Sequence, residues 1–227
     1  QDNKEITSKI KKALENNQSN KYFFGHDFNY LKAENNFIQY EDYKGSLILP
    51  EPSVLGDHQL GNISTSIATA RKLFDVKDED IKTGISKIEL KGRLQEIKSG
   101  KLKALVGPNR LICDGGHNIN AAKAIANWVK QQNQNVHLIV GMMKDKDHQG
   151  FINCFKDLVS SITLIDIPNQ EGSINKEKFK NKLNNLNQNI KISESIFKSI
   201  EELNQNNNSM ILITGSLYLA GEVLNLN

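Results

Sequence analysis

Apolar positions recur at helical spacing near the start of the chain and again in its second quarter. Ile6, Ile10 and Leu14 keep this spacing among lysines and glutamates, which is typical of a surface helix. Between Lys21 and Leu49 the pattern changes to short stretches of aromatic and β-branched residues separated by polar or glycine turns, which predicts antiparallel strands. We expect helices over residues 2–16, 59–74 and 78–88, and strands at KYFFG, FNYLKA, NFIQYE and GSLILP.

Beyond residue 90, apolar runs that fit strands alternate with stretches that fit helices. This alternation predicts a mostly parallel sheet covered by helices on both faces, because parallel neighbours need a crossover connection. The Asn-rich segments 183–189 and 204–208 are typical of polar loops. We expect strands at KALV, RLIC, VHLIVG, SITLID, IKI and MILIT, and helices over residues 117–131, 147–157, 175–184, 194–204 and 217–224.

The change of pattern predicts a domain boundary at about residue 90, with one domain over residues 1–90 and another over residues 91–227. A length of 227 residues fits either one large domain or two small ones. The chain begins with Gln1 and not with methionine, so we expect it to be a piece of a longer polypeptide.

Charge and cysteine content narrow the partners and the compartment. The net charge of +3 comes from 29 basic and 26 acidic residues without a dense basic block, so we expect no nucleic-acid partner. The chain has two cysteines, Cys113 and Cys154, which suits a reducing compartment, and we expect the protein in the cytoplasm. No apolar run approaches the roughly 20 residues that span a bilayer, so we expect no membrane partner.

The segment LICDGGHNINAAKAIANWVK, residues 111–130, carries the strongest chemical signal. An apolar strand ends at Asp114, turns through Gly115 and Gly116, and enters a helix after His117. In an open α/β sheet, ligands bind at such strand-to-helix turns, where unpaired backbone N–H groups favour an anion. Asp114 could hold a ribose hydroxyl, a metal-bound water or an ammonium group. Alternatively, it is a plain N-cap that shares this duty with Asn118.

His117 could orient or deprotonate a nucleophile, or bind a carboxylate when it is charged. Ser216 follows a second apolar strand in MILITGSLYLAGEVL and could hydrogen-bond an anion, although capping the next helix is the more common role of serine. We expect both turns to lie on one side of the sheet and to share one anionic ligand. A third strand end carries Lys144, Asp145, Lys146 and Asp147, which we interpret as a solvated charged loop.

Two further segments could contribute to this site. His58 and Asn62 are one helical turn apart in GDHQLGN, and an amide such as Asn62 can both donate to and accept from the edge of a base. The alternative is a capping segment with Asp57 as the cap. Arg93 follows Gly92 at the domain boundary, where its guanidinium could clamp a phosphate or stack on a base, or where it is an ordinary linker residue.

Two common nucleotide motifs are missing from the printed sequence. No GxGxxG follows a strand, so a nicotinamide or flavin dinucleotide site is unsupported. No GxxxxGK[ST] phosphate loop occurs either.

Five segments occur in an order and spacing that resemble the carboxyl-terminal half of the bacterial folylpolyglutamate synthase/dihydrofolate synthase family, within the Mur ligase superfamily. The resemblance covers nearly the whole chain and implies an α/β fold. Residues 1–90 would complete the central ATPase-type domain, and residues 91–227 would form a glutamate-binding domain with a mostly parallel, Rossmann-like sheet. The five segments are GDHQLGN, KGRLQEI, LICDGGHNINAA, LIVGMMKDKD and ITGSLYLAGEVL.

The resemblance implies an ATP-dependent amide ligase. ATP would phosphorylate a carboxyl group of dihydropteroate or folate, and the amine of L-glutamate would attack the acyl phosphate. By resemblance, Asn62, Arg93 and Asp114 would help to hold ATP, and His117 and Ser216 would bind or orient glutamate. Asp114 and His117 would be the catalytic residues.

The family's phosphate loop and Mg²⁺ ligands belong to an amino-terminal part that lies outside this sequence. We therefore expect no metal ligands here and no ligation by the chain alone, with a separately encoded amino-terminal half as a candidate partner. The chain departs from the family at Gly116, where alanine is usual, at Ile119, where proline is usual, and at Lys91.

Two alternatives remain open at this point. One is another ligase of the superfamily, such as a peptidoglycan-precursor ligase or a cyanophycin synthetase, although GDHQ and MMKDKD favour the folate branch. The other is a non-catalytic remnant that binds a nucleotide or an amino acid.

Overall fold

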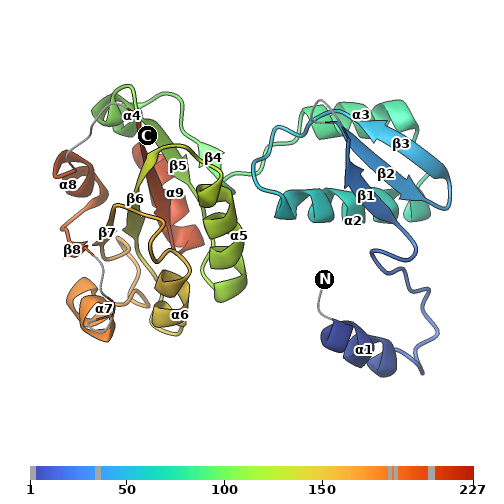
Figure 1. The fold of residues 1–227 in the computed structure, drawn as a ribbon, viewed down its shortest axis with the longest axis horizontal. Helices are drawn as coiled ribbons and strands as arrows, with labels where there is room; N and C mark the ends of the chain where they lie inside the picture. The colour runs from blue at the N-terminus through green and yellow to red at the C-terminus, as the bar shows by residue number, and fades with distance from the viewer. Residues whose placement is uncertain (1–3, 34–36, 184–185, 187–188, 204–207) are drawn as a thin grey trace. The chain divides into compact units, whose positions relative to one another are not determined.

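The computed structural model describes residues 4–33, 37–183, 186, 189–203 and 208–227. The chain divides into two compact units, each with its own secondary structure (Figure 1). The first unit comprises Gln1–Ser53 and His58–Ile88, and the second comprises Val54–Asp57 and Glu89–Asn227.

The first unit is a small antiparallel sheet with helices. Its strands pair in the order β1-β2-β3, with Tyr40 opposite both Tyr30 and Leu47. Leu47 and Leu49 alternate with exposed positions of β3, as expected of a strand with one buried face. Its elements are α1 (Lys4–Ala13), β1 (Asn29–Lys32), β2 (Ile38–Asp42), β3 (Gly45–Leu49), α2 (His58–Leu73) and α3 (Asp78–Ser86).

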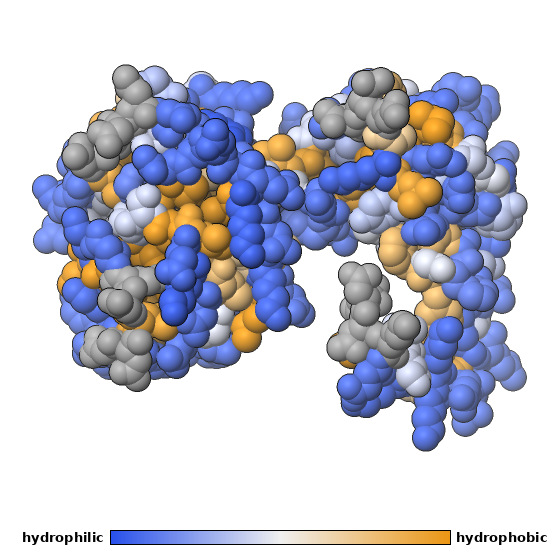
Figure 2. Space-filling view, viewed as in Figure 1, coloured by the Kyte–Doolittle hydropathy of each residue, from blue (hydrophilic) through white to orange (hydrophobic). Residues whose placement is uncertain are grey.

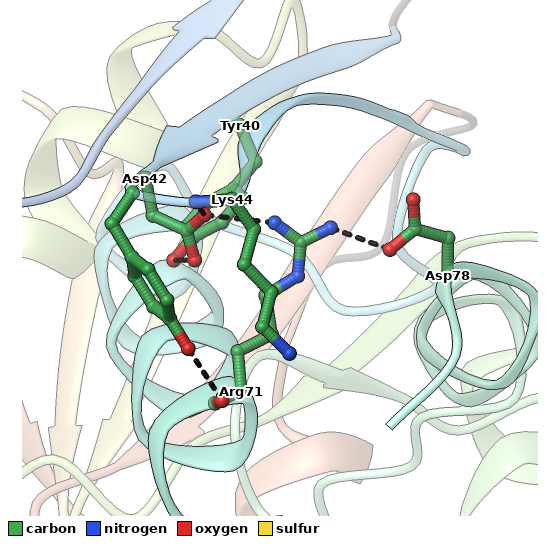
Figure 3. A network of polar contacts seen from close by, with 6 residues as sticks. Tyr40, Asp42, Lys44, Arg71 and Asp78 are labelled. Atoms are coloured by element: carbon green, nitrogen blue, oxygen red, sulfur yellow. Dashed lines mark hydrogen bonds and ion pairs between the residues drawn. The ribbon is translucent and has the colours of Figure 1, made fainter. Parts of the chain in front are cut away.

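A buried arginine joins the sheet of the first unit to α2 and α3. Arg71, in α2, donates from Nη1 to Asp42 Oδ1 at 2.9 Å and from Nη2 to Asp78 Oδ1 at 2.5 Å (Figure 3). The Tyr40 hydroxyl donates to Asp42 Oδ2 at 3.0 Å. Burial and the Asp42 carboxylate raise the pKa of Tyr40 above its usual value. The guanidinium is 3% exposed, so the two carboxylates compensate a charge that water does not reach.

The second unit is a parallel sheet with one antiparallel edge strand. Within the described residues, six strands follow the order β4-β5-β9-β6-β7-β8, and only the β4–β5 pair is antiparallel. The strands are β4 (Gln95–Glu96), β5 (Arg110–Cys113), β6 (Asn135–Val140), β7 (Ser161–Leu164), β8 (Ile190–Ile192) and β9 (Ser209–Thr214). The helices are α4 (Lys101–Val106), α5 (Ile119–Lys130), α6 (His148–Asn153), α7 (Lys176–Lys182), α8 (Ile196–Glu201) and α9 (Leu217–Leu226).

Side chains of β9 pack alternately into two cores, one on each face of this sheet. Met210 and Leu212 pack with residues of α5, α6 and α7, whereas Ile211 and Ile213 pack with residues of α4, α8 and α9. Because β9 is buried on both faces, four consecutive residues of MILIT are apolar. Figure 2 shows hydrophilic residues along the outer side of α5, as its amphipathic sequence requires. The predicted mostly parallel α/β sheet with helices on both faces is confirmed.

Several local predictions were wrong. KALV, predicted as a strand, lies in α4, because Leu102 and Val106 are a helical turn apart and both are buried. KYFFG forms no strand beyond an isolated bridge between Phe24 and Phe28. The helices α6 and α8 are shorter than expected, and β4 was not predicted. Parts of the Asn-rich segments, and of the helices expected over 175–184 and 194–204, lie outside the described residues.

In the described residues, no helix is both long enough and apolar enough to span a bilayer. The two cysteine thiols are free, and Cys113 is buried.

Candidate functional site

The carboxyl ends of three parallel strands lie next to one another in the second unit. Because β9 lies between β5 and β6, the turns that follow these strands share one edge of the sheet. The Gly215 N–H donates to the carbonyl of Gly116 at 3.0 Å, and the Gly141 N–H donates to the carbonyl of Thr214 at 3.3 Å. The turn after Asp114 and the turn before Ser216 are therefore on the same side of the sheet, as expected.

Asp114 connects two backbone segments within this edge. The residue is 3% exposed. Its Oδ1 accepts from the Gly116 N–H at 2.6 Å and its Oδ2 accepts from the Leu94 N–H at 2.8 Å. The alternative that Asp114 caps the next helix is wrong, because Asn118 is the N-cap of α5 and accepts from the Ala121 N–H at 2.9 Å. Asp114 thus fixes the local backbone through its own hydrogen bonds, without a ligand.

The unpredicted strand β4 brings Arg93 to the same turn. The Gly115 N–H donates to the carbonyl of Gly92 at 2.8 Å. A Cβ added to Gly115 would lie 2.9 Å from Arg93 Nη1, so the guanidinium passes directly over this glycine. Leu94 has a φ of +42°, a strained value for a non-glycine residue, which the bond from its N–H to Asp114 helps to hold. Arg93 therefore lies against the turn that follows Asp114, where its Nη1 also donates to the Gly92 carbonyl at 3.2 Å.

His117 has a fixed tautomer in its neutral form. Its Nδ1 lies 3.0 Å from the carbonyl oxygen of Gly115. A carbonyl can only accept, so Nδ1 carries the proton and Nε2 is left as an acceptor. The neighbouring loop contributes Asp145, whose pKa is lowered mainly by its hydrogen bond to Lys146 and to a smaller extent by His117. The His117 imidazole thus lies near the ion pair of Asp145 and Lys146 at this edge.

Ser216 is the N-cap of α9. Its Oγ accepts from the Tyr218 N–H at 3.1 Å, and the residue is 2% exposed. The capping alternative for Ser216 is therefore confirmed, and its hydroxyl proton remains available as a donor. The preceding Gly215 has a φ of +111°, and a Cβ there would lie 2.6 Å from the carbonyl oxygen of Gly141. Only glycine fits this position without a backbone shift.

Asn62 belongs to the first unit, apart in the chain from the residues above. It lies in α2, where its Nδ2 donates to Gln59 Oε1 at 3.0 Å. The Gln59 Nε2 in turn lies 3.0 Å from His58 Nε2. The HQxxN segment therefore forms a linked set of side chains on the first turns of one helix.

The charged loop after β6 is largely solvated, as expected, with Lys144, Asp145 and Asp147 exposed. Asp147 nevertheless has a structural role, because its Oδ1 accepts from the Gly150 N–H at 2.8 Å and caps α6. Sequence reasoning missed both β4 and the link between Leu94 and Asp114. A two-residue strand has no periodic signal that could have revealed them.

Two chemistries gain no support at this edge. Burial raises the pKa of Cys113 to about 12, with a smaller contribution from Asp114, so this thiol does not supply a nucleophile at neutral pH. Across the part of the chain that the structure describes, no group of three or more His, Cys, Asp or Glu side chains could hold a metal ion.

Residues 92–217 match the family described as Mur ligase, glutamate ligase domain. The dihydrofolate synthase/folylpolyglutamate synthase of Bacillus subtilis is 26% identical over 192 residues, which are 81% of this chain and 41% of that protein. The folylpolyglutamate synthase of Lacticaseibacillus casei is 25% identical over 210 residues, which are 88% of this chain and 46% of that protein. The chain thus spans less than half the length of these curated relatives.

Solved structures share the fold. FolC of E. coli, in complex with ADP and without folate substrate, has a TM-score of 0.79 and 23% identity over 96% of this chain and 50% of that one. The bifunctional folylpolyglutamate synthase/dihydrofolate synthase of Yersinia pestis, complexed with AMPPNP and Mn ion, has a TM-score of 0.77 and 19% identity over 97% of this chain and 50% of that one. Because the family match covers more than half of the sequence and includes Arg93, Asp114, His117 and Ser216, the chain belongs to the Mur ligase family, glutamate ligase domain.

Proposed function

We propose that this chain is the glutamate-side part of an ATP-dependent amide ligase that joins L-glutamate to dihydropteroate or folate. The hydrogen bond from Gly215 N–H to the Gly116 carbonyl carries this proposal, because it puts the His117 turn and the Ser216 turn at one edge of the sheet. The names of the Bacillus and Lacticaseibacillus relatives support the choice of acceptor. In this proposal, residues 1–90 complete the ATPase-type domain and residues 91–227 form the glutamate-binding domain.

Arg93 is the proposed nucleotide contact of the second unit. Its guanidinium lies over Gly115, where the absence of a side chain lets Arg93 and Leu217 pack against the turn. From this position its planar donors could contact a phosphate or stack on a base. Asp114 accepts from the N–H of Leu94, which follows Arg93, and from the N–H of Gly116, so we assign it a positioning role towards the nucleotide. Asn62 is the proposed contact from α2, where Gln59 orients its amide.

His117 and Ser216 are the proposed glutamate contacts. With Nδ1 bonded to Gly115, the His117 Nε2 can accept a proton from the attacking amine, or bind a carboxylate when the ring is charged. The Ser216 hydroxyl can donate its proton to a glutamate carboxylate at the start of α9.

ATP would supply the phosphoryl group that turns the acceptor carboxylate into an acyl phosphate. The glutamate amine then attacks the acyl carbon, an amide C–N bond forms, the C–O bond to phosphate breaks, and the amine loses a proton. A fixed imidazole and helix amino ends that bind anions lower the cost of orienting these groups. The proposed enzyme acts in the cytoplasm, and an amino-terminal half supplies its phosphate loop and Mg²⁺ ligands.

The test is steady-state kinetics of a completed enzyme, in which the chain is joined to an amino-terminal part that carries a phosphate loop. We expect glutamate addition to dihydropteroate or folate, and we expect His117→Ala and Arg93→Gln each to lower kcat/KM roughly tenfold or more. Lys98→Gln removes an exposed charge a few residues from Arg93 and serves as the control. Addition of glutamate to neither acceptor would refute the substrate, and unchanged kinetics in both variants would refute the site.

A further inference from the structure

A second feature of the same sheet edge is a cavity of about 440 Å³ beyond the loop that follows β6. Its lining comes from Lys144 in that loop, from the segment 166–175 after β7, and from α7. None of the site residues proposed above lines it. Because β6 pairs with β9 on one side and with β7 on the other, the cavity and the His117 turn occupy neighbouring positions along one edge.

The cavity has an excess of positive charge. Lys144, Lys178 and Lys182 line it together with a single carboxylate, that of Asp166. The Asp166 charge is already engaged, because its Oδ1 accepts from the Lys176 N–H at 2.7 Å and its Oδ2 lies 3.8 Å from Lys176 Nζ. Considering the described residues alone, none of the three lining lysines is in an ion pair. Three ammonium groups near one cavity favour an anionic ligand.

A buried histidine contacts one of these lysines, Lys182. His148 is 3% exposed, and its Nε2 donates to the Met143 carbonyl at 3.0 Å. Its Nδ1 therefore accepts, and Lys182 Nζ lies 3.5 Å from it. The imidazole also packs edge-on against Phe179, with ring centroids 5.0 Å apart. An ammonium group has three donors, so Lys182 keeps donors for a ligand after this contact.

The helix α7 presents its lysines in two different ways. Lys178 and Lys182 are four residues apart, which places both on the face that borders the cavity. Lys180 is exposed and does not line the cavity. The buried Phe179 fixes the rotation of the helix.

We propose that this cavity binds a short chain of carboxylates, the chemistry of a γ-linked oligoglutamate, through Lys144, Lys178 and Lys182. Its volume lies within the range of about 300–1,000 Å³ that is usual for small-molecule sites, which is more than a single phosphate group fills. The lining residues Ile167 and Ile174 suit the methylene groups between successive carboxylates. The inference rests on the proposed function, because a ligase that extends a glutamylated acceptor must accommodate the carboxylates already present.

The test is isothermal titration of the full 227-residue chain with γ-linked triglutamate. We expect the double variant Lys178→Gln/Lys182→Gln to bind roughly tenfold or more weakly than the unmodified chain, because two charge-assisted contacts are lost. Lys180→Gln removes a charge from the same helix without reaching the cavity and should bind as the unmodified chain does. Equal affinity of the double variant and the Lys180 variant would overturn the proposal. Circular dichroism shows whether each variant is folded, and the single variant Lys178→Gln replaces the double one if that does not fold.

Two further titrations identify the ligand and separate this inference from the proposed function. Inorganic phosphate should bind weakly and should not displace triglutamate, and displacement at similar concentration would overturn the assignment to carboxylates. Free L-glutamate should not displace triglutamate at similar concentration, because its proposed contacts, His117 and Ser216, do not line the cavity. Displacement at similar concentration would place the acidic chain at the His117 turn and overturn the separate site. Failure of ligation in the completed enzyme would leave these binding results intact.

Discussion

Asp114 shows how a residue singled out for chemistry can act first on the backbone. Its two carboxylate oxygens accept from two N–H groups that come from different segments, Leu94 and Gly116. An Asp at a strand end was recognisable from the sequence, but its partner in the KGRL segment was not, because that partner depends on a tertiary contact. The same holds for Arg93, which is near the turn only because β4 pairs with β5.

Asp114→Asn should destabilise the chain, because the amide NH₂ would face a backbone donor where an acceptor is needed. We expect a loss of about 1–3 kcal/mol in the free energy of unfolding, the cost of an unsatisfied buried donor. Urea unfolding followed by circular dichroism measures it. Asp145→Asn makes the same chemical change at an exposed position and should leave the transition where it is. Coinciding transitions for the two variants would show that Asp114 does not hold the backbone.

Alanine substitutions at two glycines should have opposite effects on the stability of the chain. Gly215→Ala should cost more than about 1 kcal/mol, because Gly215 has a positive φ and the new Cβ would meet the carbonyl of Gly141. Gly221→Ala, in α9, meets nothing within 4 Å and should stabilise the chain by about 0.4–1 kcal/mol. Thermal unfolding of the two variants checks the order, and a Gly215 variant as stable as the Gly221 variant would contradict it.

At the scale of elements, the strands were predicted best where the run of apolar residues is longest. MILIT and VHLIVG were recognisable as strands because they are mostly apolar, and they form the buried strand β9 and most of the strand β6. The prediction for KALV failed because three consecutive apolar residues do not distinguish a strand from one turn of a buried helix. The strand β4 was not predicted, because its pairing with β5 is determined by the chain around it and not by its own two residues.

Arg71→Met should destabilise the elements of the first unit strongly. The change leaves Asp42, whose side chain is 2% exposed, without its cation, and breaking a buried pair in this way costs about 3–5 kcal/mol. Hydrogen exchange of amides in α2 and β2 measures the loss of protection. Arg110→Met removes a partly exposed partner of Glu96 and should have a much smaller effect on exchange in its own strand. Comparable losses of amide protection in the two variants would show that burial of the ion pair does not determine how much its removal destabilises the chain.

His148 should make stability depend on pH. Burial lowers its pKa below the ordinary 6.5, and Lys182 adds to this, although the Met143 hydrogen bond and Asp147 oppose it. The unfolded chain therefore binds a proton at His148 near pH 6.5, whereas the folded chain binds it only at lower pH. The neutral His148 stabilises the folded state above pH 6.5, and this stabilisation is lost as the pH falls below that value. Burial also lowers the pKa of His137, which adds a slope of the same sign.

The measurement is the free energy of unfolding between pH 7.5 and pH 5, compared with His148→Gln. We expect the free energy of unfolding of the unmodified chain to decrease towards low pH. The decrease should be shallower in the variant, because one of the two histidines with a lowered pKa has been removed. Parallel curves would show that His148 is not the source.

At the scale of the whole molecule, the fold class was predictable and the strand order was not. Alternating strands and helices after residue 90 predict a parallel sheet with helices on both faces, and this is what the second unit contains. That β9, the last strand, lies between β5 and β6 could not be derived from periodicity. The placement matters for the proposed function, because it puts Ser216 beside the His117 turn.

The 227-residue chain alone should give no ATP- and glutamate-dependent extension of folate or dihydropteroate. The reason is chemical, since no GxxxxGK[ST] segment in the printed sequence can cradle the transferred phosphate. Incubation of the purified chain with ATP, labelled glutamate and acceptor, followed by product analysis, checks this. Measurable turnover would refute the division of labour proposed above.

Trp128 is the single tryptophan of the sequence and lies in α5, the helix that begins just after His117. The guanidinium of Arg110 lies 5.8 Å from the centre of its ring, so the indole has one charged neighbour whose movement would alter its emission. Trp128 is in the last turn of α5 and Arg110 is the first residue of β5, so both lie at the opposite end of the sheet from the His117 turn. The emission of this indole can therefore follow unfolding of the second unit without an attached dye.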